Sequence, residues 1–248
     1  MPPIDPVLDD IASAIEDGRH EQALQLLIPL FESTREERSG PSHFMTMFMW
    51  EQLLEAYAPA RDAYVRARDE QVRLLLLGDA AFPGGGNRPP RTRFQLIVTM
   101  NETLDELHAT YELFVQFESL MPELARKQAF LALPAIIEAR DFALAERYLA
   151  DPLDQLDRLN QMARDLHLFP PAADSPRLGA ELANFMKDVR LRSILLDGLE
   201  RESEADTLRL AALSGIASDD MRALAERELA APGTIMQELS DRFSQPHN

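Results

Sequence analysis

Small and large apolar residues alternate at helical spacing in several parts of the chain. Tyr57, Ala60, Tyr64 and Ala67 follow one another at intervals of three, four and three residues. This spacing places the four side chains on one face of a helix, where the small residues allow close approach of a second helix and the large ones interlock with it. The pattern therefore predicts an all-α protein built from tandem antiparallel helical pairs.

The same periodicity predicts helices over most of the chain. A stripe of apolar residues from Ile97 to Met121 predicts one long helix, and Pro134 is expected to interrupt the helix that begins at Pro122. The run of Met, Phe and Trp at 44–50 is apolar on nearly every side, which indicates a helix of the core; a Met-rich binding surface is the alternative. The expected helices cover about 5–17, 20–38, 44–54, 59–77, 97–121, 139–150, 151–167, 177–199, 205–213, 219–229 and 234–243, and a further one starts at 122.

Two stretches rich in Pro and Gly divide this pattern. Residues 78–93 contain Pro83-Gly84-Gly85-Gly86 and Pro89-Pro90, a density of helix breakers that predicts a flexible loop. Residues 169–176 carry a second cluster of prolines. We therefore expect a helical-pair region at 1–168 and a C-terminal helical bundle or cap at 174–248.

Three segments resemble the second helix of a tetratricopeptide repeat. They are the segment from Gly18 to Leu30 with its small residue Ala23, the stripe of Tyr57, Ala60, Tyr64 and Ala67, and the triplet Phe142, Ala145 and Leu149. The first-helix half of the motif departs from the family, because Ile11, Phe48 and Leu133 stand where that family has Gly or Ala. The resemblance implies a protein-binding groove and no chemistry.

Composition narrows the function classes further. The net charge of −17 disfavours a nucleic-acid partner and an anionic membrane surface, while it permits a basic protein partner. The absence of cysteine excludes disulfides, thiolate nucleophiles and Cys-ligated metals. No stretch reaches the ~18 apolar residues of a membrane span, and the acidic N-terminus does not resemble a secretory signal, so we expect a cytoplasmic protein.

No motif for catalysis stands out. Asp105 and His108 lie three residues apart, but a di-iron site needs two Glu-x-x-His pairs, and Glu-x-x-His does not occur. The glycines at 84–86 lack the Lys-Ser/Thr of a phosphate loop, and the following Arg88, Arg91 and Arg93 are read as part of a linker rather than an anion site. We expect no cofactor, no metal and no enzymatic activity.

Charge is distributed unevenly between two consecutive segments. Seven arginines and four acids lie between Arg61 and Arg93, whereas residues 101–123 hold six acids and no Lys or Arg. Either the two segments pack together and neutralise one another, or the second presents an acidic surface to a basic partner. The candidate partner-binding residues are Glu102, Asp105, Glu106 and Glu112. The sequence thus favours a non-enzymatic protein-interaction module of the adaptor, chaperone or immunity type; the alternative is a helical enzyme or a small-ligand-binding bundle.

Overall fold

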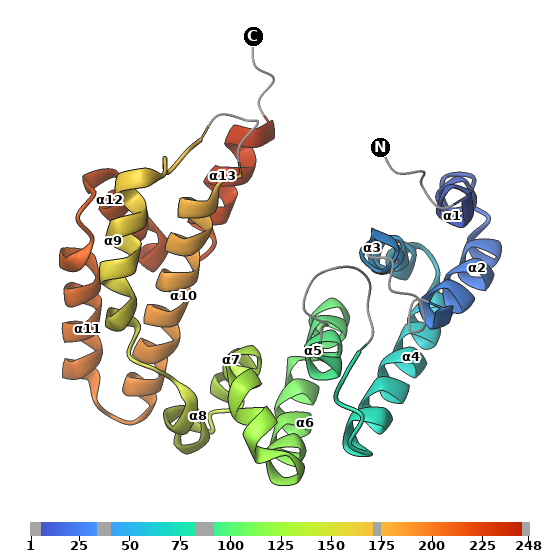
Figure 1. Ribbon diagram of the computed structural model, residues 1–248, viewed down its shortest axis with the longest axis horizontal. Helices are drawn as coiled ribbons and strands as arrows, with labels where there is room; N and C mark the ends of the chain where they lie inside the picture. Colours follow the sequence, from blue (N-terminus) through green and yellow to red (C-terminus); the bar gives the residue numbers. More distant parts are fainter. Residues whose placement is uncertain (1–5, 34–40, 83–91, 171–174, 245–248) are drawn as a thin grey trace. The chain divides into compact units, whose positions relative to one another are not determined.

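The computed structural model describes residues 6–33, 41–82, 92–170 and 175–244, and the secondary-structure elements in these ranges are all helices (Figure 1). The predicted all-α class is confirmed. In these ranges no helix is long and apolar enough to cross a membrane. The central residues of the predicted flexible loop, 83–91, and half of the second proline cluster, 171–174, lie outside the described residues.

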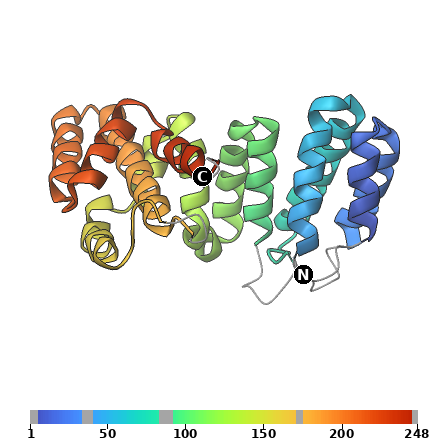
Figure 2. The same ribbon diagram turned by 90° about the horizontal axis from the view of Figure 1, so that it is seen from above.

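The chain divides into two compact units, residues 1–135 and 136–248. The boundary expected at 168–174 from the second proline cluster falls within the second of these units. In the first unit, consecutive helices between α1 and α6 pack against one another (Figure 2). In addition, α1 contacts α3, and α4 contacts α6. These helices are α1 (Pro6–Glu16), α2 (His20–Ser33), α3 (Pro41–Ala56), α4 (Ala58–Leu76), α5 (Arg93–Leu104) and α6 (Leu107–Leu120).

The Tyr/Ala stripe of α4 explains how α3 and α4 pack. Ala60 and Tyr64 are fully buried, and the Trp50 ring lies edge-on to the Tyr64 ring at a centroid distance of 5.3 Å. The small side chain of Ala60 leaves its carbonyl oxygen open to the Trp50 indole, whose Nε1–H donates to it at 3.2 Å. Burial of the indole without this bond would cost free energy, so the pairing of Trp50 with Ala60 fixes how the two helices meet.

The second unit gathers around one long helix. Helix α10 (Arg177–Gly198) contacts every other helix of this unit: α8 (Phe142–Tyr148), the short 3₁₀ helix η1 (Pro152–Gln155), α9 (Leu156–Asp165), α11 (Glu202–Gly215), α12 (Asp219–Ala230) and α13 (Thr234–Ser244). Leu182, Phe185 and Val189 of α10 are almost fully buried in its core. The sequence predicts a helical bundle or cap over 174–248, and three of the helices that pack on α10, namely α8, η1 and α9, lie before that range.

Local signals in the sequence set several helix ends. The side chain of Thr92 accepts a hydrogen bond from the Gln95 N–H at 3.1 Å, and that of Asp141 accepts from the Leu144 N–H at 3.1 Å, so each caps the helix that follows it. The carboxylate of Glu228 accepts from the N–H groups of Gly233 and Ile235 and satisfies the first turn of α13.

The prediction of one helix over 97–121 is wrong. Helix α5 ends at Leu104 and α6 begins at Leu107, because Asp105 adopts a left-handed backbone with φ 60°. The N–H of Glu106 then bonds to the Asn101 carbonyl oxygen at 2.8 Å, a closing bond typical of a helix C-terminus. Aspartate tolerates this conformation better than most residues.

Two further expectations need correction. Helix α7 (Pro122–Glu138) continues through Pro134, so the proline removes one ladder bond without interrupting the helix. In the 44–50 run, Met47, Met49 and Trp50 are buried as expected of the core, but the stacked rings of Phe44 and Phe48 are 62% and 44% exposed. Helix α3 therefore has one aromatic face in contact with solvent.

Candidate partner-binding surface

The predicted acidic residues surround the junction of α5 and α6, which we call the α5–α6 corner (residues 102–112). Glu102 lies in the last turn of α5, and Asp105 and Glu106 form the two-residue connection. Glu112 lies one and a half turns into α6. These acids were expected along one straight helix. Because the chain breaks between α5 and α6, they lie around a bend instead.

Glu106 is part of an internal charge network rather than a free surface group. Its carboxylate accepts a hydrogen bond from the Arg68 guanidinium of α4 at 2.9 Å. The Arg68 side chain is only 10% exposed and also donates to Asp69 at 2.6 Å and to the side-chain oxygen of Asn101. Neutralisation by the arginine-rich segment, one of the two hypotheses, thus holds for Glu106.

The Arg68 network also ties three helices together. Asn101, which is almost fully buried in α5, receives the bond from Arg68 and donates from Nδ2 to the hydroxyl of Thr110 in α6 at 3.0 Å. Nearby, Arg61 donates to the Leu104 carbonyl oxygen at 2.8 Å and satisfies the end of α5. These roles of Asn101 and Thr110 could not be predicted from the sequence, since a polar residue on a helix is expected to be exposed until its buried partner is known.

The other three acids differ from Glu106. Glu102, Asp105 and Glu112 are exposed, and no lysine or arginine in the described ranges pairs with any of them. Glu112 lies 3.4 Å from the exposed imidazole of His108. The corner therefore presents three carboxylates that no Lys or Arg of the described residues pairs with, beside Arg61, which caps α5, and Arg68, which binds Glu106.

Of the three arginines at the end of the predicted loop, Arg93 has a structural role. Its side chain is 2% exposed, and it donates to the carboxylate of Asp79 at 2.6 Å, to the carbonyl oxygens of Asp79 and Ala81 at 2.7 and 2.9 Å, and to the side chain of Gln71. Arg93 thereby holds the 79–81 segment against α4. Arg88 and Arg91 lie outside the described residues.

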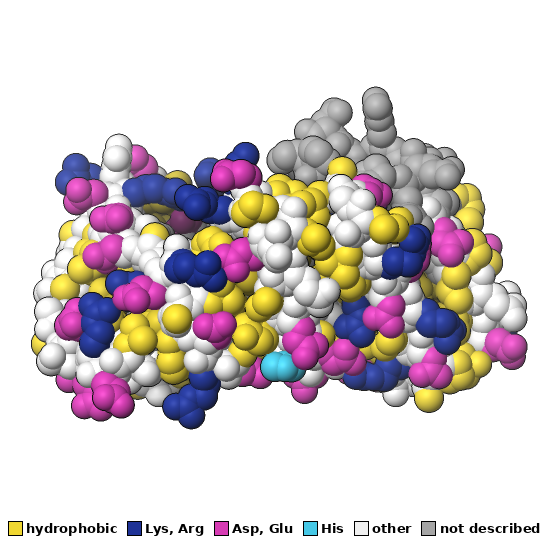
Figure 3. All heavy atoms as spheres, turned by 90° about the horizontal axis from the view of Figure 1, so that it is seen from below, with side chains coloured by type: hydrophobic (Ala, Val, Ile, Leu, Met, Phe, Trp, Pro, Cys, Tyr) yellow, Lys and Arg dark blue, Asp and Glu magenta, His cyan; other side chains and the backbone are white. Residues whose placement is uncertain are grey.

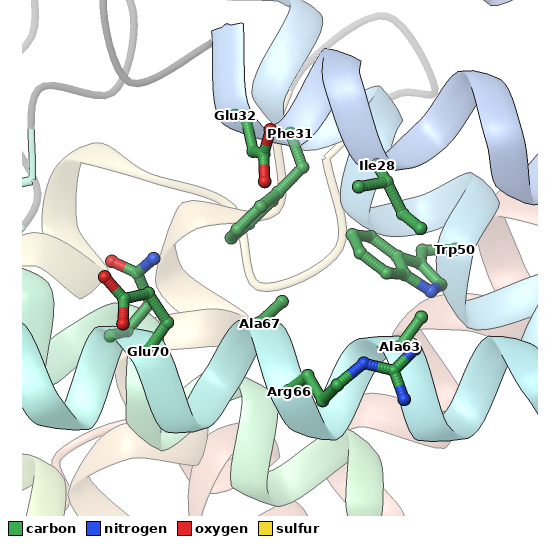
Figure 4. Close-up of a pocket in the computed structure, with 9 residues that line it drawn as sticks. Ile28, Phe31, Glu32, Trp50, Ala63, Arg66, Ala67 and Glu70 are labelled. Carbon is green, nitrogen blue, oxygen red and sulfur yellow. The ribbon is translucent and has the colours of Figure 1, made fainter.

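The first unit also contains a hollow between α2, α3 and α4 (Figure 4). Its volume is about 180 Å³, and it is lined by apolar groups of Ile28, Phe31, Trp50, Ala63 and Ala67 and by polar groups of Glu32, Arg66, Glu70 and Gln71. Ala63 and Ala67 belong to this lining, and Ala63 is only 4% exposed. The small residues of α4 were predicted to contact a neighbouring helix, and the hollow was not predicted.

Charge on the surface is mixed outside the corner. On the face shown in Figure 3, acidic and basic side chains are interspersed with hydrophobic ones. The described residues include no group of three or more His, Asp or Glu side chains placed to hold a metal ion. Asp105 and His108 thus belong to no such group.

No protein-family model, curated protein or solved structure matches this chain. The similarity to tetratricopeptide repeats accordingly depends on the residues quoted for it.

Proposed function

We propose that this chain is a non-enzymatic protein-interaction module built from tetratricopeptide-like helical pairs. Its role would be that of an adaptor, a chaperone or an immunity-type protein in the cytoplasm. Its partner is a protein with a basic surface, which docks on the α5–α6 corner.

One observation carries the proposal: Glu102, Asp105 and Glu112 remain exposed and unpaired with Lys or Arg among the described residues, although an arginine-rich helix packs beside them. Arg68 turns instead to Glu106 and Asn101. Open carboxylates of one sign attract basic groups and accelerate their association. Solubility alone would be served equally well by acids placed anywhere on the surface.

The experiment is capture of partners from the native host with the tagged protein. The wild type is compared with a triple charge reversal, Glu102→Lys, Asp105→Lys and Glu112→Lys, which leaves Glu106 in place because reversal there would oppose the buried Arg68. A control reversal of three exposed acids elsewhere, Asp10, Glu16 and Glu226, makes the same change in net charge.

We expect the wild type and the control reversal to retain the same basic partner and the corner reversal to lose it. Equal retention by all three proteins would show that the corner is not the docking site. Circular dichroism of each variant verifies that its helices are intact.

A further inference from the structure

A second hollow of the first unit lies at the start of α2, and we call it the Tyr57 hollow. It is lined by residues 18–22 and Gln25 and by Tyr57, which stands between α3 and α4. Its volume is about 600 Å³, within the range of sites that bind small molecules. Tyr57 and His20 are partly exposed and the other lining residues are exposed, so the hollow offers surface to a ligand.

Two aromatic rings supply the carbon surface of the Tyr57 hollow. The rings of His20 and Tyr57 have their centroids 6.0 Å apart and are tilted by 47° to one another. Among the described residues, no Ala, Val, Leu, Ile or Met side chain belongs to the lining. A hydrocarbon chain would therefore bury little of its surface here, whereas one face of a small ring has an aromatic surface to pack on.

The rest of the lining consists of groups that form hydrogen bonds. The side chains of Glu21, Gln25 and Tyr57 form no hydrogen bond or ion pair with any described residue. Gln22 accepts a bond from Arg19 at 2.7 Å through Oε1, and its Nε2 group donates to none of the described residues. The hollow thus offers a ligand two amides, a hydroxyl group and a carboxylate, which together can both donate and accept.

The charges of the Tyr57 hollow disfavour an anionic ligand. Arg19 is the only Lys or Arg of the described lining, and it is held by the Asp17 carboxylate at 2.7 Å and by Gln22. The carboxylate of Glu21 is open and would repel a phosphate or a second carboxylate. A neutral ligand rich in hydroxyl groups meets no such repulsion, and each hydroxyl can both donate to Glu21 and accept from an amide.

We propose that the Tyr57 hollow binds a neutral saccharide of one or two rings. The C–H face of one sugar ring packs on Tyr57 and His20, and the hydroxyl groups exchange hydrogen bonds with Glu21, Gln22 and Gln25. This site shares no residue with the α5–α6 corner and does not depend on the protein-partner proposal.

The test is a titration of the ¹⁵N-labelled protein followed by NMR, in which the backbone amide of Gly18 and the side-chain amides of Gln22 and Gln25 report on the hollow. The probes are maltose, cellobiose, lactose and N,N′-diacetylchitobiose. We expect at least one of the four to shift these signals saturably, with a Kd in the millimolar range because the site is open to water. Sorbitol has the hydroxyl groups without a rigid C–H face, and putrescine is a cation without hydroxyl groups. Each should bind at least about tenfold more weakly than the best sugar.

Two variants assign the contacts. Tyr57→Ala removes the aromatic surface and should weaken the best sugar at least about tenfold. Gln25→Ala should weaken it about three- to tenfold, the ratio for one hydrogen bond of ordinary strength. Gln52→Ala, at an exposed position of α3 outside the hollow, is the control and should bind as the wild type does.

The proposal is overturned if none of the four sugars gives a saturable shift, or if the sugar that binds leaves the signals of Gly18, Gln22 and Gln25 unchanged. It also fails if sorbitol or putrescine binds as tightly as the best sugar, because the hollow would then recognise hydroxyl groups or charge alone. Since Gln25 is exposed, its variant tests the site even if Tyr57→Ala does not fold, and unchanged affinity in Gln25→Ala would contradict the assignment.

Discussion

The guanidinium of Arg68 in α4 lies 2.9 Å from the carboxylate of Glu106 at the start of α6. This pair spans 38 residues of the chain and joins the arginine-rich segment to the acidic one. The sequence allowed two hypotheses for the acidic segment, internal neutralisation or a surface for a basic partner. The first holds for Glu106, whereas Glu102, Asp105 and Glu112 face solvent and are open to a partner. Arg68 is thus a structural residue, and the first prediction concerns its removal.

Arg68→Ala should destabilise the first unit by about 3 kcal/mol, since loss of one member of a buried charged network leaves the others unsatisfied. The buried side-chain oxygen of Asn101 would lose its donor, and Glu106 its counter-ion. Urea unfolding followed by Trp50 fluorescence measures the change. Arg66→Ala, two residues earlier in the same helix and exposed, is the matched control and should unfold near the wild-type midpoint. Equal stability of the two variants would mean that the Arg68 network contributes nothing to the fold.

Ala60→Glu should destabilise the first unit by about 3 kcal/mol or more, because it adds volume and an unpaired charge at a fully buried position. The new side chain would also force apart Trp50 and the carbonyl oxygen that it binds. Ala58→Glu, at an exposed position in the first turn of the same helix, is the control and should have little effect. An unchanged melting temperature for Ala60→Glu would contradict the packing of α3 on α4.

Gly198→Ala should destabilise the second unit, although alanine normally favours a helix over glycine by about 1 kcal/mol. A methyl group at Gly198 would lie 2.3 Å from the Phe142 ring of α8, so α8 and α10 could not keep their present approach. We expect a loss of about 1–2 kcal/mol, as for other overpacked contacts. In a Phe142→Leu background the same substitution should become neutral or stabilising. A loss of equal size in both backgrounds would show that the ring is not the obstacle.

Alkaline pH should destabilise the first unit through Tyr64. Burial raises the pKa of its phenol; the Thr103 side chain offsets part of this rise, and the nearby Glu51 carboxylate adds to it. In the unfolded chain a tyrosine titrates near about 10, so the stabilising effect of the protonated phenol is complete below that pH and is lost as the pH rises above it. The free energy of unfolding, measured by urea titration between pH 8 and 11.5, should fall less steeply for Tyr64→Phe than for the wild type. The control Tyr57→Phe, at a partly exposed position, should follow the wild type; equal slopes for all three would refute the assignment.

Apolar periodicity predicted the all-α class and most of the helices from the sequence. The apolar stripes place helices close to their observed positions. The break at Asp105 could not be predicted from apolar periodicity. The stripe from Ile97 to Met121 keeps its spacing through the break, whereas the left-handed turn is stabilised by the bond from the Glu106 N–H to Asn101 and by Arg68, which lies more than thirty residues away in the chain.

The candidate site was predictable only in part. Uneven charge pointed to the segment 101–123, but charge patterns do not distinguish Glu106 from Glu102. That difference depends on which carboxylate a buried guanidinium can reach, and this is a property of tertiary packing. The hollow over Ala63 and Ala67 was missed for a related reason, since the sequence shows small residues without showing whether a neighbour fills the space above them.

The most direct test of the account is the salt dependence of partner binding at the α5–α6 corner. With the captured partner in hand, its dissociation constant is measured between low and physiological ionic strength for the wild type, the corner reversal and the control reversal of Asp10, Glu16 and Glu226. The account predicts that wild-type affinity falls steeply with salt, that the control keeps this slope, and that the corner reversal binds at least about a hundredfold more weakly, or about 2.7 kcal/mol, with a much shallower slope. A corner reversal that is folded and binds with the affinity and salt slope of the wild type would contradict the account.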